Sequence, residues 1–455
     1  MYQCKGCGGR LKFDIPSQQL KCEYCSTLYD PYSVEDGPAA SERCDYDVTI
    51  FSCPQCGGEI FSTDETAAGF CSFCGASTIL ESRLGKKNRP VHVIPFHKTK
   101  EDCKEAYGKV IRNAIFAPKE LRDKNYIDGF RGIYMPHWKY HFKQDGDFNL
   151  DGRETFRRGD YIITNHYDLI GTIDAKYDGL TFDASSSFAD NISERLAPFN
   201  IHEMKEFTPS YLSGFYADVS DVSAETYAND MKKITQEESL ARIKHLPQFS
   251  RYSVTSTYQS LGKVTHQETP ELTMFPVWFL SYRKGDRISY ATVNGQTGKV
   301  VVDLPIDKKK YILGSLLLAL PIFFLLNMFF TFRPVTTLLF AVILSIITHI
   351  VHLIEGNHIK NRETLSDDKG AIGKIMHKDN PATAGTFITV INVIAIILSV
   401  FVMFLRPVSD WYYYGCAIFA LFTELFLIMD VISRYNLLAT RPLPQFNHKG
   451  GDDRA

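Results

Sequence analysis

Four apolar segments stand out in the C-terminal part of the chain. They cover residues 311–332, 335–354, 386–405 and 412–432 within the range 306–440, and hardly any charged residue interrupts them. A helix of about 20 apolar residues is long enough to cross a hydrocarbon core of about 30 Å. A helix that is apolar on every side can also lie in a large soluble core, but four such segments in succession favour insertion into a membrane. We therefore predict a four-helix transmembrane bundle made of two hairpins.

Residues 83–305 show shorter patterns of both kinds. Helical periodicity predicts helices in KTKEDCKEAYGKVIRNAIF, which ends before Pro118, in SSFADNISERLAPF and in SAETYANDMKKITQEESLARI. Alternating aromatic and β-branched residues predict strands in GDYIITNHYDLIGTID and in RISYATVNGQTGKVVVDLP, where NGQTG is the turn of a hairpin. This mixture predicts an α+β domain.

Two segments of this domain share a Pro-x-Trp motif. The motif spans Pro136 to Trp138 in IYMPHWKYHF and Pro276 to Trp278 in MFPVWFLSYR. The repetition indicates equivalent strands of a duplicated or pseudo-symmetric sheet. Large aromatic residues on strands are typical of a core, and the floor of a ligand cleft is the alternative interpretation.

The N-terminal region carries a cysteine pattern that occurs twice. The spacing C-x2-C-x14-C-x2-C recurs at an offset of 49 residues, and two C-x-x-C turns brought together complete the tetrahedral S4 shell that Zn2+ prefers. We therefore predict two zinc ribbons, one in residues 1–30 and one in residues 49–82, joined by a linker over 31–48. The first ligand set is Cys4, Cys7, Cys22 and Cys25, and the second is Cys53, Cys56, Cys71 and Cys74.

Other roles for these cysteines fit less well. Disulfides need an oxidising compartment, and a redox C-x-x-C pair belongs in a βαβ context that the pattern lacks. Glycine pairs at 8–9 and 57–58 follow two of the C-x-x-C turns and suit a backbone with positive φ. Four protein ligands leave no open position at the metal, so both zinc ions are expected to be structural.

The distribution of charge predicts the orientation. The chain opens MYQCKGCGGR without an apolar export segment. Lys308–Lys310 precede the first span, further basic residues lie between spans two and three, and Arg434 and Arg441 follow the end of the last span. The two tight turns carry only Arg333 and Arg406. Positive-inside counting then predicts a multi-pass protein of the cell membrane with both termini, including the tail 441–455, in the cytoplasm.

Polar residues inside the spans form a candidate intramembrane site. The set is His349, His352, Glu424 and Asp430, with Asn327 and Asn392 as further polar exceptions. Ionisable residues in hydrocarbon are costly and often functional, which makes a small transporter or channel an alternative function, with Glu424 as its central residue. Hydrogen bonds between helices and snorkelling at the cytoplasmic ends are the structural alternatives.

The charge of the ribbons argues against nucleic acid. Residues 1–90 contain nine Lys and Arg against twelve Asp and Glu, and each Zn2+ with four thiolates adds a charge of about −2. Nucleic-acid binding needs a basic face, and the basic cluster at 83–89 is expected in a linker after the second ribbon. We find no Gly-rich phosphate loop, nucleophile elbow or catalytic triad, and we expect no enzymatic activity.

Segments along the whole chain add a resemblance. After the tandem ribbons come VIPFHKTKEDCKEAY, FAPKEL, GIYMPHWKY, LAPFNIHEMKEFTPSYLSGFYAD, FPVWFLSYR and NGQTGKVVVDLPI, followed by four spans. This order resembles the Gram-positive bacterial membrane proteins with tandem TFIIB-type zinc ribbons, which are often labelled primosomal-helicase-like. The helicase label does not fit, because the chain has no Walker A motif.

The resemblance also implies a cellular context. A Bacillus member of that group is encoded beside a phage-shock-protein-A homologue and an SPFH/flotillin-like protein, and is associated with cell-envelope stress. Together with the closed metal sites, it implies a membrane-anchored adaptor whose ribbons and α+β domain recruit such cytoplasmic proteins to the membrane.

Overall fold

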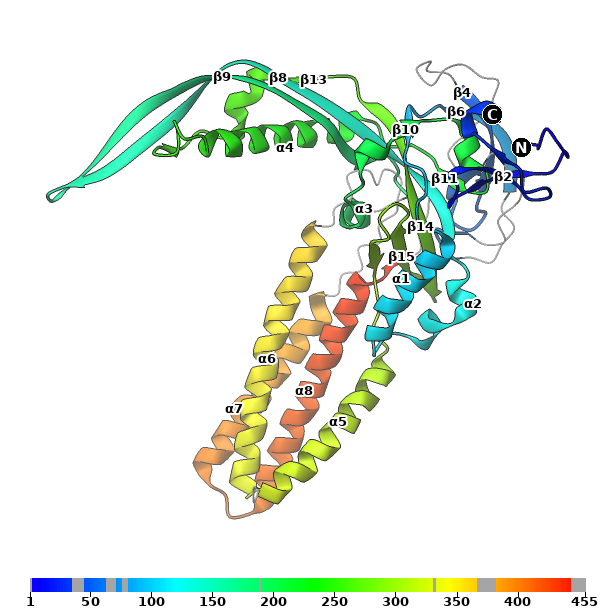
Figure 1. The fold of residues 1–455 in the computed structure, drawn as a ribbon. Helices are drawn as coiled ribbons and strands as arrows, with labels where there is room; N and C mark the ends of the chain where they lie inside the picture. The colour runs from blue at the N-terminus through cyan, green and yellow to red at the C-terminus, as the bar shows by residue number, and fades with distance from the viewer. Residues whose placement is uncertain are drawn as a thin grey trace, which may run out of the picture.

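A mixed α+β body lies at one end of four long helices, and a long β-hairpin extends from its side (Figure 1). The computed structural model describes residues 2–34, 45–62, 71–75, 81–187, 190–329, 333–365 and 382–442. The helices are α1 (Lys100–Asn113), α2 (Lys124–Ile127), α3 (Asp190–Leu196), α4 (Glu225–Lys244), α5 (Lys308–Phe329), α6 (Pro334–Leu365), α7 (Ala382–Leu405) and α8 (Asp410–Leu438).

One large mixed sheet forms the body. Its strands follow the order β10-β7-β14-β8-β11-β5-β4-β6, with β9, β12 and β13 added to β8 and with β15 joining β14 to β16 and β17. These strands are β4 (Asp45–Ser52), β5 (Glu59–Ser62), β6 (Glu81–Asn88), β7 (His92–Val93), β8 (Arg131–Arg158), β9 (Tyr161–Asp183), β10 (Lys205–Glu206), β11 (Tyr216–Asp218), β12 (Ser253–Val254), β13 (Thr265–Gln267), β14 (Glu271–Lys284), β15 (Arg287–Asn294), β16 (Val300–Val302) and β17 (Arg441–Pro442).

The centre of this sheet has an internal near-symmetry. The two Pro-x-Trp strands, β8 and β14, pair antiparallel, so that Pro136 lies opposite Met274 and Pro276 opposite Tyr134. A short strand then pairs in parallel with each of them, β11 with β8 and β7 with β14. The strand β7 leads to α1, and β11 leads to α4. Two strand–helix–hairpin units therefore meet across the β8–β14 pair. The first consists of β7, α1 and the β8–β9 hairpin, and the second of β11, α4 and the β14–β15 hairpin.

The two motif tryptophans occupy matching environments in these units. The indole of Trp278 donates to the carbonyl of Lys98, just before α1, at 2.9 Å, and that of Trp138 donates to Val222, just before α4, at 2.7 Å. Each ring thus holds the entrance of the helix that belongs to the other unit. Trp278 is buried in the core and Trp138 is half-buried at the edge of an apolar cluster, and each ring satisfies its polar N–H there.

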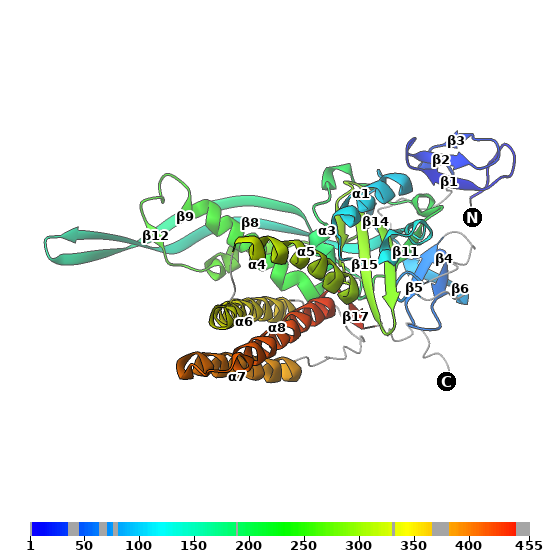
Figure 2. The ribbon, with the colours of Figure 1, turned by 90° about the horizontal axis from the view of Figure 1, so that it is seen from below.

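The hairpin of β8 and β9 is much longer than the predicted strands. It pairs without a break from Arg158–Tyr161 near its tip to His137–Asp183 at the sheet, apart from one irregularity at Tyr140/His141. The helix α4 packs on it through an apolar cluster in which Leu150, Leu169 and Leu240 take part. Beyond this cluster the hairpin forms an arm that projects to one side of the molecule (Figures 1 and 2).

The two predicted ribbons are built into the molecule in different ways. The strands β1 (Leu11–Asp14), β2 (Gln19–Cys22) and β3 (Leu28–Tyr29) form a separate three-stranded sheet. The second ribbon contributes β4, β5 and β6 to the large sheet, where β5 pairs with β11. The basic cluster at 83–89 was expected in a linker, and this expectation is wrong, because residues 81–88 form β6 and pair along β4.

Four helices are long and apolar enough to cross a membrane. The helices α6, α7 and α8 pack together around a cluster that includes Leu338, Val402 and Tyr413. The apolar stretch Lys308–Leu326 of α5 has no buried residue, and Figure 2 shows α5 apart from the other three. The structure therefore has a three-helix bundle with α5 beside it, whereas the sequence predicts one bundle of four. Hydropathy marks a span but does not say which neighbour it packs against.

Helix ends differ from the predicted ends of the spans. The helix α6 continues past residue 354 to Leu365, because helical hydrogen bonding does not stop where the apolar pattern stops. The predicted tail begins with β17, where Arg441 pairs with Ile288 of β15. Part of the predicted linker (residues 35–44), part of the predicted basic loop (residues 366–381) and residues 443–455 lie outside the described residues.

Candidate metal centres and intramembrane site

The four C-x-x-C turns share one backbone geometry. In each turn, the residue after the second cysteine has a positive φ, and its N–H donates to the carbonyl of the first cysteine at 2.8 to 3.0 Å. This closes a tight knuckle that aims both thiols to one side. The residues with positive φ are Gly8 (70°), Ser26 (58°), Gly57 (71°) and Gly75 (67°).

The knuckles meet in pairs, as the spacing predicts. Within each set of four, the sulfur atoms all lie within 4.8 Å of one another. The recorded Sγ–Sγ distances run from 3.4 Å, between Cys7 and Cys22, to 3.7 Å, between Cys56 and Cys71. A tetrahedron with a metal–sulfur distance of about 2.3 Å has edges of about 3.8 Å. Both sets can therefore hold a metal ion, and four thiolates at this spacing fit zinc.

The first cluster lies at the surface. Cys7 and Cys25 are exposed, while Cys4 and Cys22 are buried. Tyr24, between two ligands, has 87% of its surface exposed. The knuckle that contains it therefore faces solvent.

The first ribbon is held to the body through its other side. Phe13 of β1 lies against Tyr211 with ring centroids 5.3 Å apart. The Ser213 hydroxyl donates to the carbonyl of Leu11 at 2.6 Å, and Phe13 N–H donates to the Ser213 carbonyl at 3.1 Å. These contacts hold one face of the ribbon against the body and do not involve the knuckle that contains Tyr24, which remains exposed.

The second cluster lies inside the molecule. All four of its cysteines are buried. Between two of them, Phe73 packs edge-on against Phe279 of β14, and its carbonyl accepts a 2.6 Å hydrogen bond from the Tyr290 hydroxyl of β15. Burial raises the pKa of Tyr290 well above its ordinary value, so the phenol stays a donor. This knuckle is therefore a structural part of the central sheet.

The predicted intramembrane residues separate into two groups. In the first, His352 Nε2 lies 2.9 Å from Asp430 Oδ2, which also accepts from Arg434 Nε at 2.8 Å. This group joins α6 to α8. Arg434, which the sequence interpretation used only as an orientation signal, is a full member of it.

The second group surrounds an asparagine of α7. Asn392 donates to the Ser345 hydroxyl at 2.8 Å and to the Thr423 hydroxyl at 2.9 Å. Its amide oxygen lies 3.0 Å from His349 Nδ1. Asn392 is fully buried and links all three helices of the bundle. The two hydroxyl residues were not predicted, because Ser and Thr are common in apolar helices and carry no sequence signal of their own.

Glu424 lies next to the second group. It is 4% exposed, and its Oε1 atom has no hydrogen-bond partner among the residues that the structure describes. Ser345 lies beside its carboxylate. The four predicted residues thus occupy the bundle interior or its edge, but they do not form one connected site. The side chain of Asn327 is outside the described part of the chain.

Comparison with known proteins gives one distant similarity. The chain is 28% identical over 322 residues to the uncharacterized protein YdjG of Bacillus subtilis (strain 168), a match that covers 68% of this chain and 91% of the relative. No protein-family model matches the chain. No solved structure matches it. The similarity agrees with the Gram-positive resemblance at the level of a Bacillus relative, and it assigns no activity.

Proposed function

We propose that this protein is a membrane-anchored adaptor whose first zinc ribbon docks a cytoplasmic protein. In this proposal both cysteine sets hold structural zinc, the four apolar helices span the cell membrane, and the body lies in the cytoplasm. The observation that carries it is the contrast between the clusters. The second cluster is buried in the central sheet, which explains it as a structural cross-link, whereas the first cluster has two exposed ligands and an exposed tyrosine.

The chemistry of the first ribbon suits protein docking. A zinc ion with four thiolates has no open position for substrate, which disfavours catalysis. Residues 1–30 carry four Lys and Arg against three Asp and Glu, and a Zn2+ with four thiolates brings the net charge of the first ribbon to about −1, which does not favour nucleic acid. Exposed tyrosines are among the residues enriched at the centres of protein interfaces. On the resemblance, the partner is a phage-shock-protein-A-like or flotillin-like protein, in a complex that responds to envelope stress or organises the membrane.

The test compares two exposed tyrosines. Tyr24 lies on the first ribbon, and Tyr161 lies at the tip of the hairpin arm with 77% of its surface exposed. Full-length tagged protein is cross-linked in cells, solubilised and analysed by quantitative mass spectrometry. We expect Tyr24→Ala to lose the partner and Tyr161→Ala to keep it. The combination Cys22→Ser with Cys25→Ser should lose it as well, because two of four ligands are gone.

The opposite pattern would contradict the proposal. A partner lost with Tyr161→Ala but kept with Tyr24→Ala would assign docking to the arm. A partner kept by all three variants would exclude the first ribbon as the docking surface.

A small transporter or channel is the second candidate. The buried Glu424 and the Asn392 group favour it, since a buried ionisable residue in a membrane bundle is a recurrent feature of ion and proton pathways. In that case Glu424→Gln abolishes flux into proteoliposomes, and the double cysteine variant keeps it. Equal flux from wild type, Glu424→Gln and empty liposomes would reject this candidate.

A further inference from the structure

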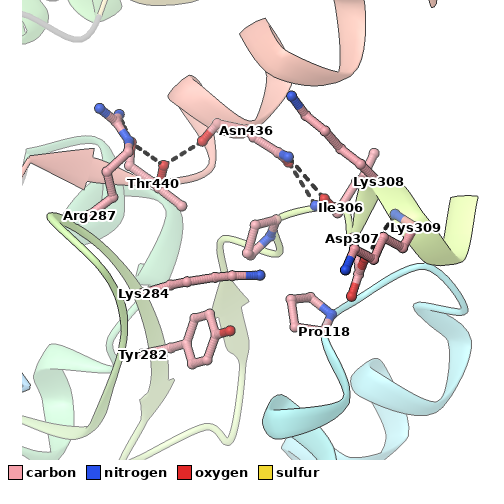
Figure 3. Close-up of a pocket in the computed structure, with 11 residues that line it drawn as sticks. Pro118, Tyr282, Lys284, Arg287, Ile306, Asp307, Lys308, Lys309, Asn436 and Thr440 are labelled. Carbon is pink, nitrogen blue, oxygen red and sulfur yellow. Dashed lines mark hydrogen bonds between the residues drawn. The ribbon is translucent and has the colours of Figure 1, made fainter. Parts of the chain in front are cut away.

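A pocket lies where the body meets the first turn of α5 and the end of α8. Its volume is about 460 Å³. The hairpin of β14 and β15 forms one wall, and the segment that leads into α5 forms another (Figure 3). Its lining residues are Pro118, Tyr282, Lys284, Arg287, Pro305, Ile306, Asp307, Lys308, Lys309, Asn436 and Thr440.

The walls of this pocket are fixed by hydrogen bonds between distant segments. Asn436 of α8 accepts from Ile306 N–H at 2.7 Å and donates to the Ile306 carbonyl at 2.9 Å. Arg287 donates to the Thr440 hydroxyl at 2.7 Å and to the Leu437 carbonyl at 2.9 Å. These bonds hold the β14–β15 hairpin, the end of α8 and the start of α5 together. The pocket is therefore a built feature of the fold.

Three donors in the pocket have no recorded acceptor. Arg287 and Lys308 already donate hydrogen bonds to protein atoms. Arg287 donates to the Leu437 carbonyl, and Lys308 Nζ donates to the Ser433 hydroxyl at 2.8 Å. No hydrogen bond or ion pair is recorded within the described ranges for the side-chain heads of Lys284, Lys309 and Tyr282. Figure 3 shows the Lys284 side chain extending from its strand toward the segment that carries Ile306.

The pocket has an excess of positive charge. Four of its lining residues are basic and one, Asp307, is acidic. Asp307 Oδ1 already accepts from the backbone N–H groups of Lys309 and Lys310, at 3.0 and 3.4 Å. Lys284 also lies directly opposite Arg287 across the hairpin. Like charges in directly opposite positions destabilise a strand pair, so an anion bound beside them would relieve this repulsion.

The position of the pocket points to the source of the anion. Lys308 begins the apolar helix α5, and Asn436 lies in the last turn of α8, so the membrane placement proposed above puts the pocket at the level of the lipid headgroups. Basic pockets at the cytoplasmic ends of membrane helices are suited to anionic lipid heads. Below the pocket, α5 exposes Leu313, Leu316 and Leu317, which offers an apolar surface to acyl chains.

We propose that this pocket binds the phosphate of an anionic phospholipid, with Lys284 and Lys309 as its ion-pairing groups and the Tyr282 hydroxyl as a further donor. The bound lipid stabilises the junction between the body and α5, which stands apart from the bundle. This inference goes beyond the adaptor function and depends only on the membrane placement.

The test uses the full-length protein in phosphatidylcholine nanodiscs with or without phosphatidylglycerol. Lipid retained after gentle extraction is counted by native mass spectrometry, and the unfolding temperature is recorded in both discs. We expect selective retention of phosphatidylglycerol and a higher unfolding temperature in its presence. Lys284→Gln with Lys309→Gln should weaken retention by about 30-fold, from the usual contribution of two lysines near a charged bilayer.

Matched variants make the result specific. Lys284→Arg with Lys309→Arg keeps both charges and should retain the lipid, while Lys244→Gln with Lys263→Gln removes two exposed charges outside the pocket and should behave as wild type. Equal retention of phosphatidylglycerol by wild type and the Lys284/Lys309 double Gln variant would overturn the proposal.

Two further arms separate this inference from its neighbours. Inorganic phosphate or glycerophosphate is added to the protein in phosphatidylcholine discs. If either raises the unfolding temperature as much as phosphatidylglycerol does, and the double Gln variant abolishes the effect, the ligand is a soluble phosphate and the lipid source is wrong. Alkaline carbonate extraction reports membrane insertion independently. If the wild-type protein resists carbonate extraction but shows no preference for phosphatidylglycerol, the pocket proposal is rejected and the adaptor proposal is unaffected.

Discussion

Removing a single hydroxyl should loosen the second metal centre without disturbing the first. Tyr290 of β15 donates to the carbonyl of Phe73, which lies between Cys71 and Cys74. The replacement Tyr290→Phe keeps the ring, which packs against Phe279 with centroids 5.1 Å apart, and removes only this hydrogen bond. Loss of one buried hydrogen bond costs about 1 to 3 kcal/mol.

This cost converts directly into a rate of metal release. The buried ligands must open before a chelator reaches the ion, and we expect the hydrogen bond of Tyr290 to Phe73, which lies between two ligands, to break in that opening. A loss of about 1 to 3 kcal/mol from the closed state then accelerates opening by about 5-fold to 150-fold. The first cluster exposes Cys7 and Cys25, so we expect zinc release from it to be faster already in the unmodified protein.

The assay adds excess chromogenic chelator to the full-length protein in detergent and follows zinc release. We expect a fast phase and a slow phase of equal amplitude, with only the slow phase accelerated by Tyr290→Phe. Tyr32→Phe is the control, because the Tyr32 hydroxyl also donates to a backbone carbonyl, that of Glu206 at 2.9 Å, but at the surface. An unchanged slow phase in Tyr290→Phe, or the same acceleration in both variants, would refute the assignment of the second cluster to the central sheet.

Four further outcomes are expected. Metal analysis of the full-length protein should give about two zinc ions per chain, and the double variant Cys22→Ser with Cys25→Ser should give about one; two zinc ions in that variant would disprove the first ligand set. Ser26→Gly should slow the fast phase of zinc release, because Ser26 has a φ of 58° and relief of that conformation is worth about 1 kcal/mol; a faster phase would count against this explanation. His137 is buried, with its ring nitrogens next to the Met135 carbonyl and the Ser193 hydroxyl, and burial lowers its pKa to about 4. The pKa of histidine in the unfolded chain is about 6.5, so the free energy of unfolding has its full value above about pH 6.5 and falls by up to about 3 kcal/mol as the pH drops toward 4. Denaturant titrations of His137→Gln should show a smaller decrease in the free energy of unfolding over this pH interval, and the same decrease as in the wild type would refute the explanation. A reporter that is active only outside the cell should stay inactive when fused after Ala455, and activity there would reverse the proposed orientation.

Short-range patterns were sufficient to predict which cysteines come together and where several helices lie. The spacing of cysteines within one knuckle brings two sulfurs together by local backbone geometry alone, so Cys4 and Cys7 could be paired without knowledge of the fold. The helix predicted to end before Pro118 and the hairpin at NGQTG also depend on neighbours a few residues away, and the structure confirms both as α1 and as β15 with β16. Apolar length identified the four long helices for the same reason.

Tertiary structure decided how these pieces are used. The two cysteine repeats have the same spacing, yet the first leaves two of its four cysteines exposed and the second is completely buried, because only the second has β11, β14 and β15 packed around it. The pairing of Pro136 with Met274 joins strands far apart in the chain, and the pocket at Lys284 needs the hairpin, α5 and α8 at once. Such contacts depend on the free energy of packing between distant segments. A local pattern in the sequence does not contain that information, so the sequence determined the parts and the fold determined which of them are structural and which remain open to a ligand or a partner.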